Sequence, residues 1–182
     1  MSYPYPPMPP AGYPVVSPYP GPGARLAAYV IDSLVVGFLG AVVGFFLVRD
    51  DVVRWFDEIE AWNPETSPAP EPDMSDLYIL SAVTLLIWFA YRIIMETSRG
   101  QTLGKMALKM KVVDFDGRTP DFGASFLRNS WYLVNFLAGT VPLLGTLVSF
   151  GIYIALGTTI SRSPYNQSFA DRWGKTYVVS TR

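Results

Sequence analysis

The chain has 182 residues, of which 50% are hydrophobic, a formal net charge of −1, and neither histidine nor cysteine. The missing cysteines exclude disulfides and thiolate chemistry, and the missing histidines exclude imidazole metal ligands and histidine pH sensing. The sequence also lacks a nucleophile–base pair, a cofactor motif and the basic patch of a nucleic-acid-binding protein. We therefore expect no enzyme, no cofactor or metal, and no nucleic-acid partner.

Residues 1–23, MSYPYPPMPPAGYPVVSPYPGPG, are rich in Pro, Tyr and Gly and carry no charge. A segment of this composition cannot bury enough apolar surface to form a core, so we expect a disordered tail. The alternative is that the tail binds an aromatic-lined groove of a partner protein, because its Tyr-Pro pairs hold aromatic anchors on an extended backbone.

Long apolar runs follow at residues 26–48, 77–95 and 122–160. About 20 apolar residues in a helix match the ~30 Å hydrocarbon core of a bilayer. A soluble helix rarely stays apolar on all its faces over such a length. The sequence therefore predicts one integral membrane domain over residues 24–182, with the lipid bilayer as its surroundings.

The connections between these runs differ in charge. Residues 49–76 contain nine acidic residues and two arginines, whereas residues 92–128 contain seven basic and four acidic residues. Lys and Arg accumulate on the cytoplasmic side of membrane proteins, so we expect the basic loop 96–121 and the N-terminal tail inside and the acidic loop outside. Within the acidic loop, residues 51–62 have apolar side chains near helical spacing and predict a short interfacial helix.

The third apolar region, 122–160, is too long for one ordinary span and contains TVPLLGT near its middle. Pro142 should end or kink a helix, and Gly145 permits a turn. The region then forms either one kinked span, which gives three crossings, or a hairpin of helices 122–141 and 143–160. Basic residues in the C-terminal segment favour the hairpin, because it returns this segment to the cytoplasm.

Two β-branched runs, residues 109–117 and 175–180, lie outside the apolar regions. An isolated strand is not stable, so we expect these two to pair as a small cytoplasmic sheet beside the C-terminal segment 161–182. Such pairing requires both strands on one face of the membrane. We therefore expect an all-α membrane bundle of about four transmembrane helices, with three as the alternative.

The GQTLGK motif at residues 100–105 is not a phosphate-binding loop, because its lysine is followed by Met106 rather than Ser or Thr. We expect Thr102 to cap a short amphipathic helix on the membrane surface. In the first apolar run, Gly37, Gly40 and Gly44 permit close helix packing, either within one chain or in a homo-oligomer.

Two charged residues mark the first apolar run. Arg25 lies at its entrance and Asp32 lies seven residues further on. Seven residues make almost two helical turns and about 10 Å of rise, so both side chains leave from nearly the same face. A carboxylate at that depth costs a few kcal/mol unless it meets a partner or a water-filled cavity. The candidate partners at the inner ends of the other helices are Arg92, Glu96, Arg128 and Asn129.

Two interpretations of Asp32 remain open. One is a permanent structural ion pair with Arg128 or Arg25, and the other is a carboxylate that binds a proton or cation. A single intramembrane acid without histidine is weak support for a transporter, because proton relays use chains of ionisable groups.

Three segments together resemble the RDD family of small bacterial membrane proteins: ARLAAYVIDSLVV, SRGQTLGKMALKMKVVDFDGRTPDFGASFLRN and SFADRWGKTYVV. The family is named for an arginine at the entrance of the first helix, an aspartate within it and an aspartate near the C-terminus. These match Arg25, Asp32 and Asp171 here. The resemblance runs from residue 23 to the C-terminus, and Pro-rich N-terminal extensions occur among actinobacterial members.

The resemblance implies a bacterial cell membrane location, transport of small solutes or ions as one suggested role, and an Asp171 that fastens the C-terminal strand to the GQTLGK loop through Lys105 or a helix N-terminus. Family members often have a histidine where Ala170 stands, so a proton relay through it is not available here. From the residues we expect first an accessory protein that binds partners through the tail 1–23 or the acidic loop 49–76. The second expectation is a proton or sodium transporter or antiporter that uses Asp32.

Overall fold

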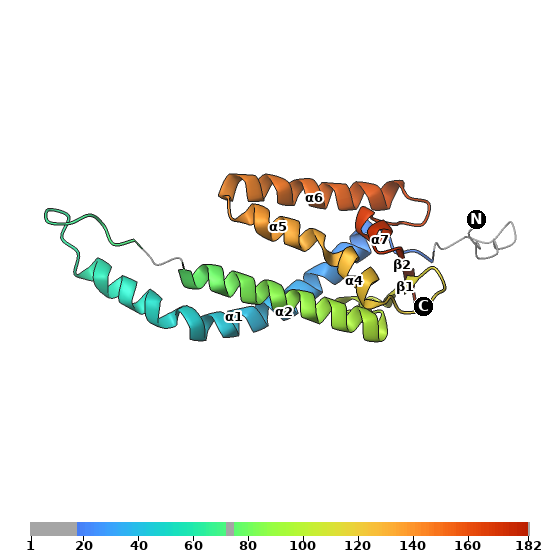
Figure 1. The fold of residues 1–182 in the computed structure, drawn as a ribbon, viewed down its shortest axis with the longest axis horizontal. Helices are drawn as coiled ribbons and strands as arrows, with labels where there is room; N and C mark the ends of the chain where they lie inside the picture. Colours follow the sequence, from blue (N-terminus) through green and yellow to red (C-terminus); the bar gives the residue numbers. More distant parts are fainter. Residues whose placement is uncertain (1–17, 72–74, 182) are drawn as a thin grey trace, which may run out of the picture.

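A computed structural model describes residues 18–71 and 75–181, so most of the expected disordered tail lies outside the described residues. The long helices are α1 (Pro22–Glu60), α2 (Ser75–Arg99) and α6 (Pro142–Arg162). The shorter elements are α3 (Leu103–Ala107), β1 (Met110–Asp114), α4 (Phe122–Asn129), α5 (Trp131–Gly139), α7 (Phe169–Trp173) and β2 (Thr176–Ser180). Figure 1 shows long helices with the strands, α4 and α7 gathered near the end where α1 begins, and α5 lying alongside α6.

Helix α1 is one unbroken helix of 39 residues. At 1.5 Å per residue its length is about 58 Å, roughly twice the thickness of the hydrocarbon core. Residues 49–60 continue the helix, so the acidic loop is shorter than expected and the separate interfacial helix at 51–62 is not formed. The reason is local: residues 45–60 contain no Pro or Gly to end the helix. The change from apolar to charged residues there marks a change of surroundings and leaves the backbone unaffected.

Among the described residues, three helices are long and apolar enough to cross a membrane: Pro22–Glu60, Tyr78–Arg99 and Leu143–Arg162. The helix expected at 122–141 is divided at Ser130 into α4 and α5, of 8 and 9 residues. Neither piece is long enough to cross the bilayer alone. The structure therefore supports a helical membrane domain with three candidate spans and leaves the fourth expected span divided.

The chain turns back between α5 and α6, which lie side by side (Figure 1). Pro142 occupies the first turn of α6, where its missing N–H costs nothing. Gly145 permits the close approach of the two helices, because a Cβ there would lie 2.6 Å from the Cα of Gly139. Helices α5 and α6 thus form a helical hairpin that the Pro and Gly of TVPLLGT permit, although α5 is shorter than expected.

The expected pairing of the two β-branched segments is confirmed as a two-stranded antiparallel sheet in which Val112 lies opposite Val178. The sheet packs with Met110 against Ala28 of α1 in a small buried cluster. Strand β1 ends at Asp114 because this side chain accepts hydrogen bonds from the backbone of the following turn.

Two of the three glycines singled out in α1 contact α2. A Cβ on Gly44 would lie 2.9 Å from Leu80 Cδ2, and one on Gly40 would lie 3.4 Å from Thr84 Oγ1. By contrast, no described atom lies within 4 Å of a Cβ built on Gly37. The glycine pair spaced by four residues is therefore used within this chain.

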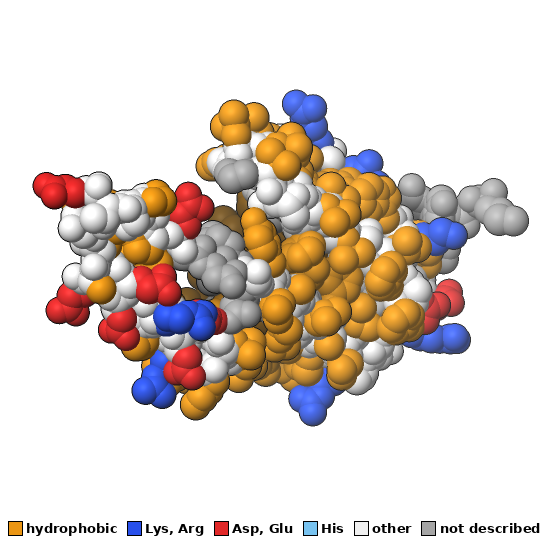
Figure 2. All heavy atoms as spheres, turned by 60° about the vertical axis from the view of Figure 1, so that its left-hand side comes forward, with side chains coloured by type: hydrophobic (Ala, Val, Ile, Leu, Met, Phe, Trp, Pro, Cys, Tyr) orange, Lys and Arg blue, Asp and Glu red, His pale blue; other side chains and the backbone are white. Residues whose placement is uncertain are grey.

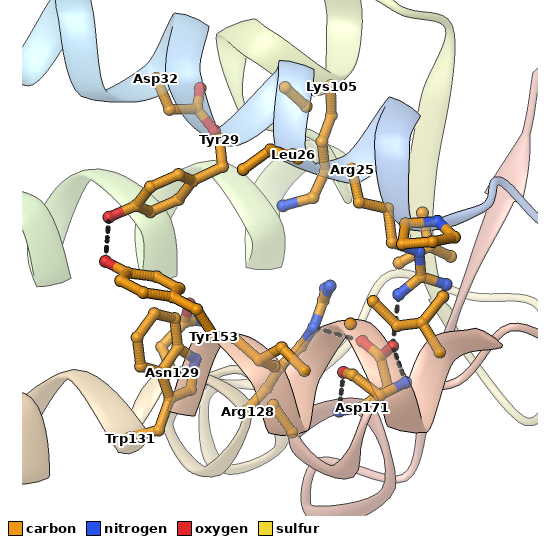
Figure 3. Close-up of a pocket in the computed structure, with 18 of the residues that line it drawn as sticks. Arg25, Leu26, Tyr29, Asp32, Lys105, Arg128, Asn129, Trp131, Tyr153 and Asp171 are labelled. Carbon is orange, nitrogen blue, oxygen red and sulfur yellow. Dashed lines mark hydrogen bonds and ion pairs between the residues drawn. The ribbon is translucent and has the colours of Figure 1, made fainter. Parts of the chain in front are cut away.

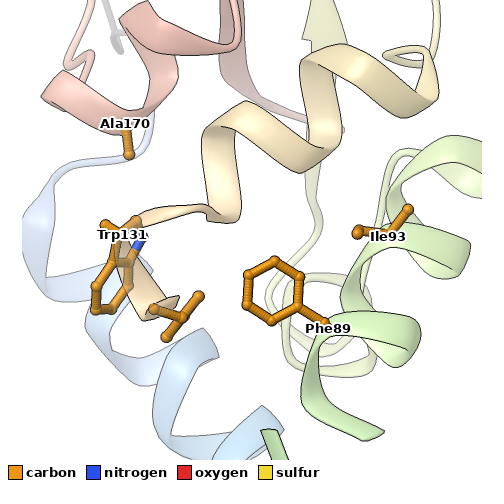
Figure 4. Packing of buried hydrophobic residues seen from close by; sticks show 5 residues of the cluster. Phe89, Ile93, Trp131 and Ala170 are labelled. Atoms are coloured by element: carbon orange, nitrogen blue, oxygen red, sulfur yellow. The ribbon is translucent and has the colours of Figure 1, made fainter. Parts of the chain in front are cut away.

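Hydrophobic side chains cover a broad area of the surface, and acidic side chains gather near the far end of α1 (Figure 2). The exposed apolar residues include Leu34, Phe38 and Phe46 of α1 and Leu143 and Phe150 of α6. The buried apolar core is small in comparison, and Phe89, Ile93, Trp131 and Ala170 form part of it (Figure 4). This inside-out distribution is that of a helical protein with lipid around it.

Candidate functional site

The expected intramembrane carboxylate, Asp32, is 1% exposed and has several donors around it. Thr102 Oγ1 donates to it at 2.6 Å, Tyr91 Oη at 2.7 Å and the backbone N–H of Gly104 at 2.8 Å. Arg92 Nη1 lies 3.7 Å from Oδ2. Of the partners expected from the sequence, only Arg92 contacts Asp32. Its two oxygens are therefore engaged by neutral donors from α2 and α3 and by one cation.

The close approach of α3 to α1 depends on Gly104. A Cβ on this residue would lie 2.1 Å from the carbonyl oxygen of Ala28. Thr102 occupies the N-cap position of α3, as expected, but its hydroxyl donates to Asp32 rather than to a backbone N–H of its own helix. Helix α3 is consequently inserted against α1 with Gly104 and Lys105 buried, rather than lying flat on the membrane surface as expected.

A second carboxylate, Glu96 of α2, is fully buried. Its donors are Lys105 Nζ at 2.7 Å, Asn129 Nδ2 at 3.1 Å, Ser125 Oγ at 3.2 Å, and Arg92 Nη2 and Arg128 Nη1 at 3.4 Å. These donors come from α2, α3 and α4. Glu96 is therefore the residue through which the three elements are joined electrostatically, a role that the sequence alone did not assign to it.

Arg92 links the two carboxylates. Besides its contacts to them, its Nε donates to Asn129 Oδ1 at 2.6 Å. Its guanidinium also lies over the rings of Trp88 and Tyr132, at 5.5 and 5.4 Å from their centroids. Cation–π contacts of this kind are strongest where the charge is shielded from water. The side chain is thus held by ion pairs, a hydrogen bond and two rings.

The third carboxylate, Asp171, lies in the first turn of α7 and forms a capping box with the N-cap residue Ser168. It is fully buried and pairs with Arg25 Nη1 and with Arg128 Nε, the latter at 2.9 Å. Burial alone raises the pKa of Asp171, but the charges of Arg128 and Arg25 outweigh this effect and hold the pKa below its ordinary value. Of the two partners expected for Asp171, Lys105 or a helix N-terminus, Lys105 pairs with Glu96 instead.

These ion pairs form one charge cluster at the end of the bundle where α1 begins, which we call the charged end. Its members are Arg25, Asp32, Arg92, Glu96, Lys105, Arg128 and Asp171. Arg25 and Asp32 both face the interior from α1, as expected, but they pair with different partners (Figure 3). Arg128 joins the parts of the cluster because it contacts both Glu96 and Asp171.

Lys105 lies outside the membrane spans, and its pKa is lowered to about 7. Burial is the main cause, the charges of Arg92 and Arg128 act in the same direction, and the charge of Glu96 opposes them. The cluster contains four basic and three acidic side chains. It therefore carries one excess positive charge when Lys105 is protonated.

A cavity of about 350 Å³ adjoins the charge cluster. Figure 3 shows that Lys105 and Arg128 point into it from opposite walls, and that Tyr29 and Tyr153 meet across one side. The hydroxyls of the two tyrosines are 3.0 Å apart. The remaining wall is mostly apolar, with Leu26, Leu156 and Ile160 among its residues. Among the described residues, no group of three acidic side chains is arranged to hold a metal ion.

Several of these contacts were not predicted from the sequence. Thr102 and Gly104 lie in the GQTLGK motif. The hydroxyl of Thr102 and the glycine two residues later were the signal in the sequence that could have indicated their contacts with α1. Tyr29 and Tyr153 lie in apolar runs and gave no signal of a shared cavity. Ser125 follows the Asp121 cap of α4 by one turn and resembles any small helical residue.

In a comparison with protein families, the model of the RDD family matches residues 19–175. This covers well over half of the chain, so the chain belongs to the RDD family, as the three sequence segments indicated. Comparisons with curated proteins and with solved structures found no match.

Proposed function

We propose that this RDD family member is an accessory protein of the bacterial cell membrane that binds a partner protein through the far end of α1. The observation that carries the proposal is the continuation of α1 as residues 49–60, here called the extension. A helix of about 58 Å cannot lie wholly within a ~30 Å hydrocarbon core. The extension therefore projects beyond the apolar part of the helix.

The extension has the surface of a binding helix. It contains five acidic residues and two arginines. Val52, Phe56 and Ile59 lie along one face of the helix and are exposed by 43, 59 and 39%. An exposed apolar stripe among charges is typical of an interaction surface, and the acidic excess favours a basic partner segment. This combination extends the expectation that the acidic region binds a partner.

The charge cluster supports an accessory role more than an ion pathway. Asp32 and Glu96 already accept hydrogen bonds from fixed neighbours, with Thr102 and Lys105 the closest of them. An ion that entered would have to replace these donors. We therefore assign the cluster to the stability of the charged end.

We further propose four crossings, with the charged end in the cytoplasm. Strands β1 and β2 pair, so they lie on the same side of the membrane, and the chain between them must cross an even number of times. Residues 122–139 of α4 and α5 follow a helical path of about 27 Å, and we propose that this divided path makes one outward crossing and that α6 returns. The basic residues near the charged end favour its cytoplasmic placement.

The partner surface is tested by photocrosslinking in intact cells. A photoreactive amino acid at Phe56 should give a discrete protein adduct, whereas the same probe at lipid-exposed Phe46 should not. The Phe56→Glu variant should lose co-purification of that same partner, and Phe46→Leu should retain it. The proposal fails if positions 46 and 56 give the same adducts, or if Phe56→Glu leaves the complex intact.

Transport of a small solute or ion is the second candidate function, and the cavity beside Asp32 is the observation in its favour. Purified protein in vesicles with a proton or sodium gradient provides the test. Gradient-coupled flux that Asp32→Asn abolishes, with folding retained, would favour the transporter over the accessory protein. Absence of flux in the unaltered protein removes this candidate.

A further inference from the structure

The cavity at the charged end has properties that a structural ion-pair network does not require. Its volume of about 350 Å³ lies within the range of small-molecule sites in proteins. Lys105 is 6% exposed, yet its ammonium group is directed into the cavity (Figure 3). One N–H of this group donates to Glu96, and an ammonium has three to offer. The cavity thus combines ligand-sized space with a buried cation.

The charges around the cavity favour an anion. Four basic and three acidic side chains form the cluster, and Arg25, Lys105 and Arg128 line the cavity. A buried charge without a counterion is costly. In addition, Arg25 Nη2 is buried without a hydrogen-bond partner among the described residues. One anionic group in the cavity would balance the excess charge that the cluster carries when Lys105 is protonated.

The apolar wall indicates that the anion carries a hydrophobic part. Leu26 and Tyr153 line the cavity and are 60 and 41% exposed. We infer that the cavity opens between α1 and α6, the helices that carry these two residues. Leu156 and Ile160 continue the apolar lining towards the charge cluster. A ligand with a charged head and an apolar chain fits both parts of this wall.

We propose that the cavity binds the anionic phosphate headgroup of a membrane lipid between Lys105 and Arg128, with its chain leaving between α1 and α6 past Tyr29 and Tyr153. Lysine and arginine are the usual phosphate-binding side chains, and basic cavities between membrane helices hold such headgroups. Free phosphate shares the headgroup chemistry and is the second source that the experiment distinguishes. The site lies at the opposite end of α1 from the extension, so it stands independently of the proposed partner surface.

Gly157 allows the cavity to be filled without altering a charge. It lines the cavity, and no described atom lies within 4 Å of a Cβ built on it. Gly157 lies on the same face of α6 as the lining residues Tyr153 and Ile160, so we expect the leucine side chain of Gly157→Leu to enter the cavity. Gly151 is the matched control, because it belongs to the same helix, has equally open surroundings and does not line the cavity. Both substitutions raise helix propensity, so neither should prevent folding.

The experiment measures thermal unfolding of the full chain in a nonionic detergent with three additives: phosphatidylglycerol, phosphatidylcholine with the same acyl chains, and inorganic phosphate. A bound ligand raises Tm by mass action. Phosphatidylglycerol should raise Tm and the other two should not. Gly157→Leu should weaken the apparent affinity at least about tenfold, and Gly151→Leu should bind as the unaltered chain does.

Native mass spectrometry of the same samples should show one phosphatidylglycerol molecule retained by the unaltered chain and by Gly151→Leu, and lost in Gly157→Leu. A Tm rise with inorganic phosphate that Gly157→Leu removes would overturn the lipid as the source and retain the anion site. Equal binding by the Gly157→Leu and Gly151→Leu variants would overturn the site. So would equal responses to the two lipids, or no response to any additive.

Discussion

Asp32 and Thr102 are joined by a hydrogen bond of 2.6 Å, although 70 residues separate them in the chain. Asp32 is 1% exposed and Thr102 is fully buried, so water does not replace either partner. The bond fastens the start of α3 to the interior face of α1. Because a buried hydrogen bond to a charged group is among the stronger ones, this contact should matter for stability.

Replacing Asp32 with asparagine should destabilise the protein. The amide keeps one acceptor but adds an N–H₂ group opposite existing donors, and it removes the negative charge near Arg92. We expect a loss of about 3 kcal/mol in the free energy of unfolding, measured by denaturation in detergent. The exposed Asp50→Asn control should change it by less than about 0.5 kcal/mol. Equal stability of the two variants would contradict this role of Asp32.

Gly104→Ala should disturb the docking of α3 on α1. The added methyl group would lie 2.1 Å from the carbonyl oxygen of Ala28, so the helices must separate and weaken the bonds to Asp32. We expect a loss of at least about 2 kcal/mol. Gly37→Ala is the control, because its surroundings are open and alanine favours the helix by up to about 1 kcal/mol. If Gly104→Ala is as stable as Gly37→Ala, the close approach does not hold α3.

Glu96 and Lys105 should be energetically coupled, since Nζ and Oε1 are 2.7 Å apart in a buried site. Glu96→Gln leaves Lys105 and two arginines near a neutral side chain and should cost about 3 to 5 kcal/mol. Lys105→Met in addition should recover part of that loss. A double-mutant cycle should give a coupling of at least about 1 kcal/mol. Strictly additive effects would mean that the pair makes no net contribution.

The pKa of Lys105 should be visible in the pH dependence of stability. Burial lowers this pKa to about 7 from its ordinary value of 10.5. Between these values the unfolded chain binds a proton that the folded chain lacks, so the free energy of unfolding rises with pH across that range. Lys105→Met should have a flatter profile there. The measurement is chemical denaturation from pH ~6 to ~9, and parallel profiles for the two proteins would refute the lowered pKa.

The sequence predicts most of the fold where one physical property decides the outcome. Apolar length predicts the spans in α1 and α2, and the β-branched runs predict the sheet, because an isolated strand is not stable and each run can pair with the other. The division at Ser130 has no such local signal, because no Pro or Gly marks that position, and the residues just before it, Arg128 and Asn129, both contact Glu96 of another helix. Local patterns do not contain this information.

The same limit applies to the site. The depth of Asp32 in an apolar helix is enough to predict that it needs partners. Which partners it meets depends on how α3 docks, and that depends on Gly104 and a backbone N–H, which carry no charge to suggest the contact. Charge alone favoured Arg128 and Arg25, and these arginines pair with Asp171 instead.

The proposed topology predicts which surfaces a membrane-impermeant thiol reagent reaches. The chain has no cysteine, so single substitutions give an unambiguous signal. Glu58→Cys, on the exposed extension, should be labelled in intact cells. Asp116→Cys, in the exposed turn after β1, should be labelled only after the membrane is permeabilised.

Ser163→Cys, in the connection after α6, separates four crossings from three. With four crossings, residue 163 lies on the same side of the membrane as Asp116. With three crossings, it lies on the opposite side. With four crossings it should behave like Asp116→Cys, since the pairing of β1 with β2 holds both connections on one side. Labelling of Ser163→Cys in intact cells, with Asp116→Cys protected, would contradict the even number of crossings. Because the strands could then pair only across the bilayer, that result would also contradict the sheet.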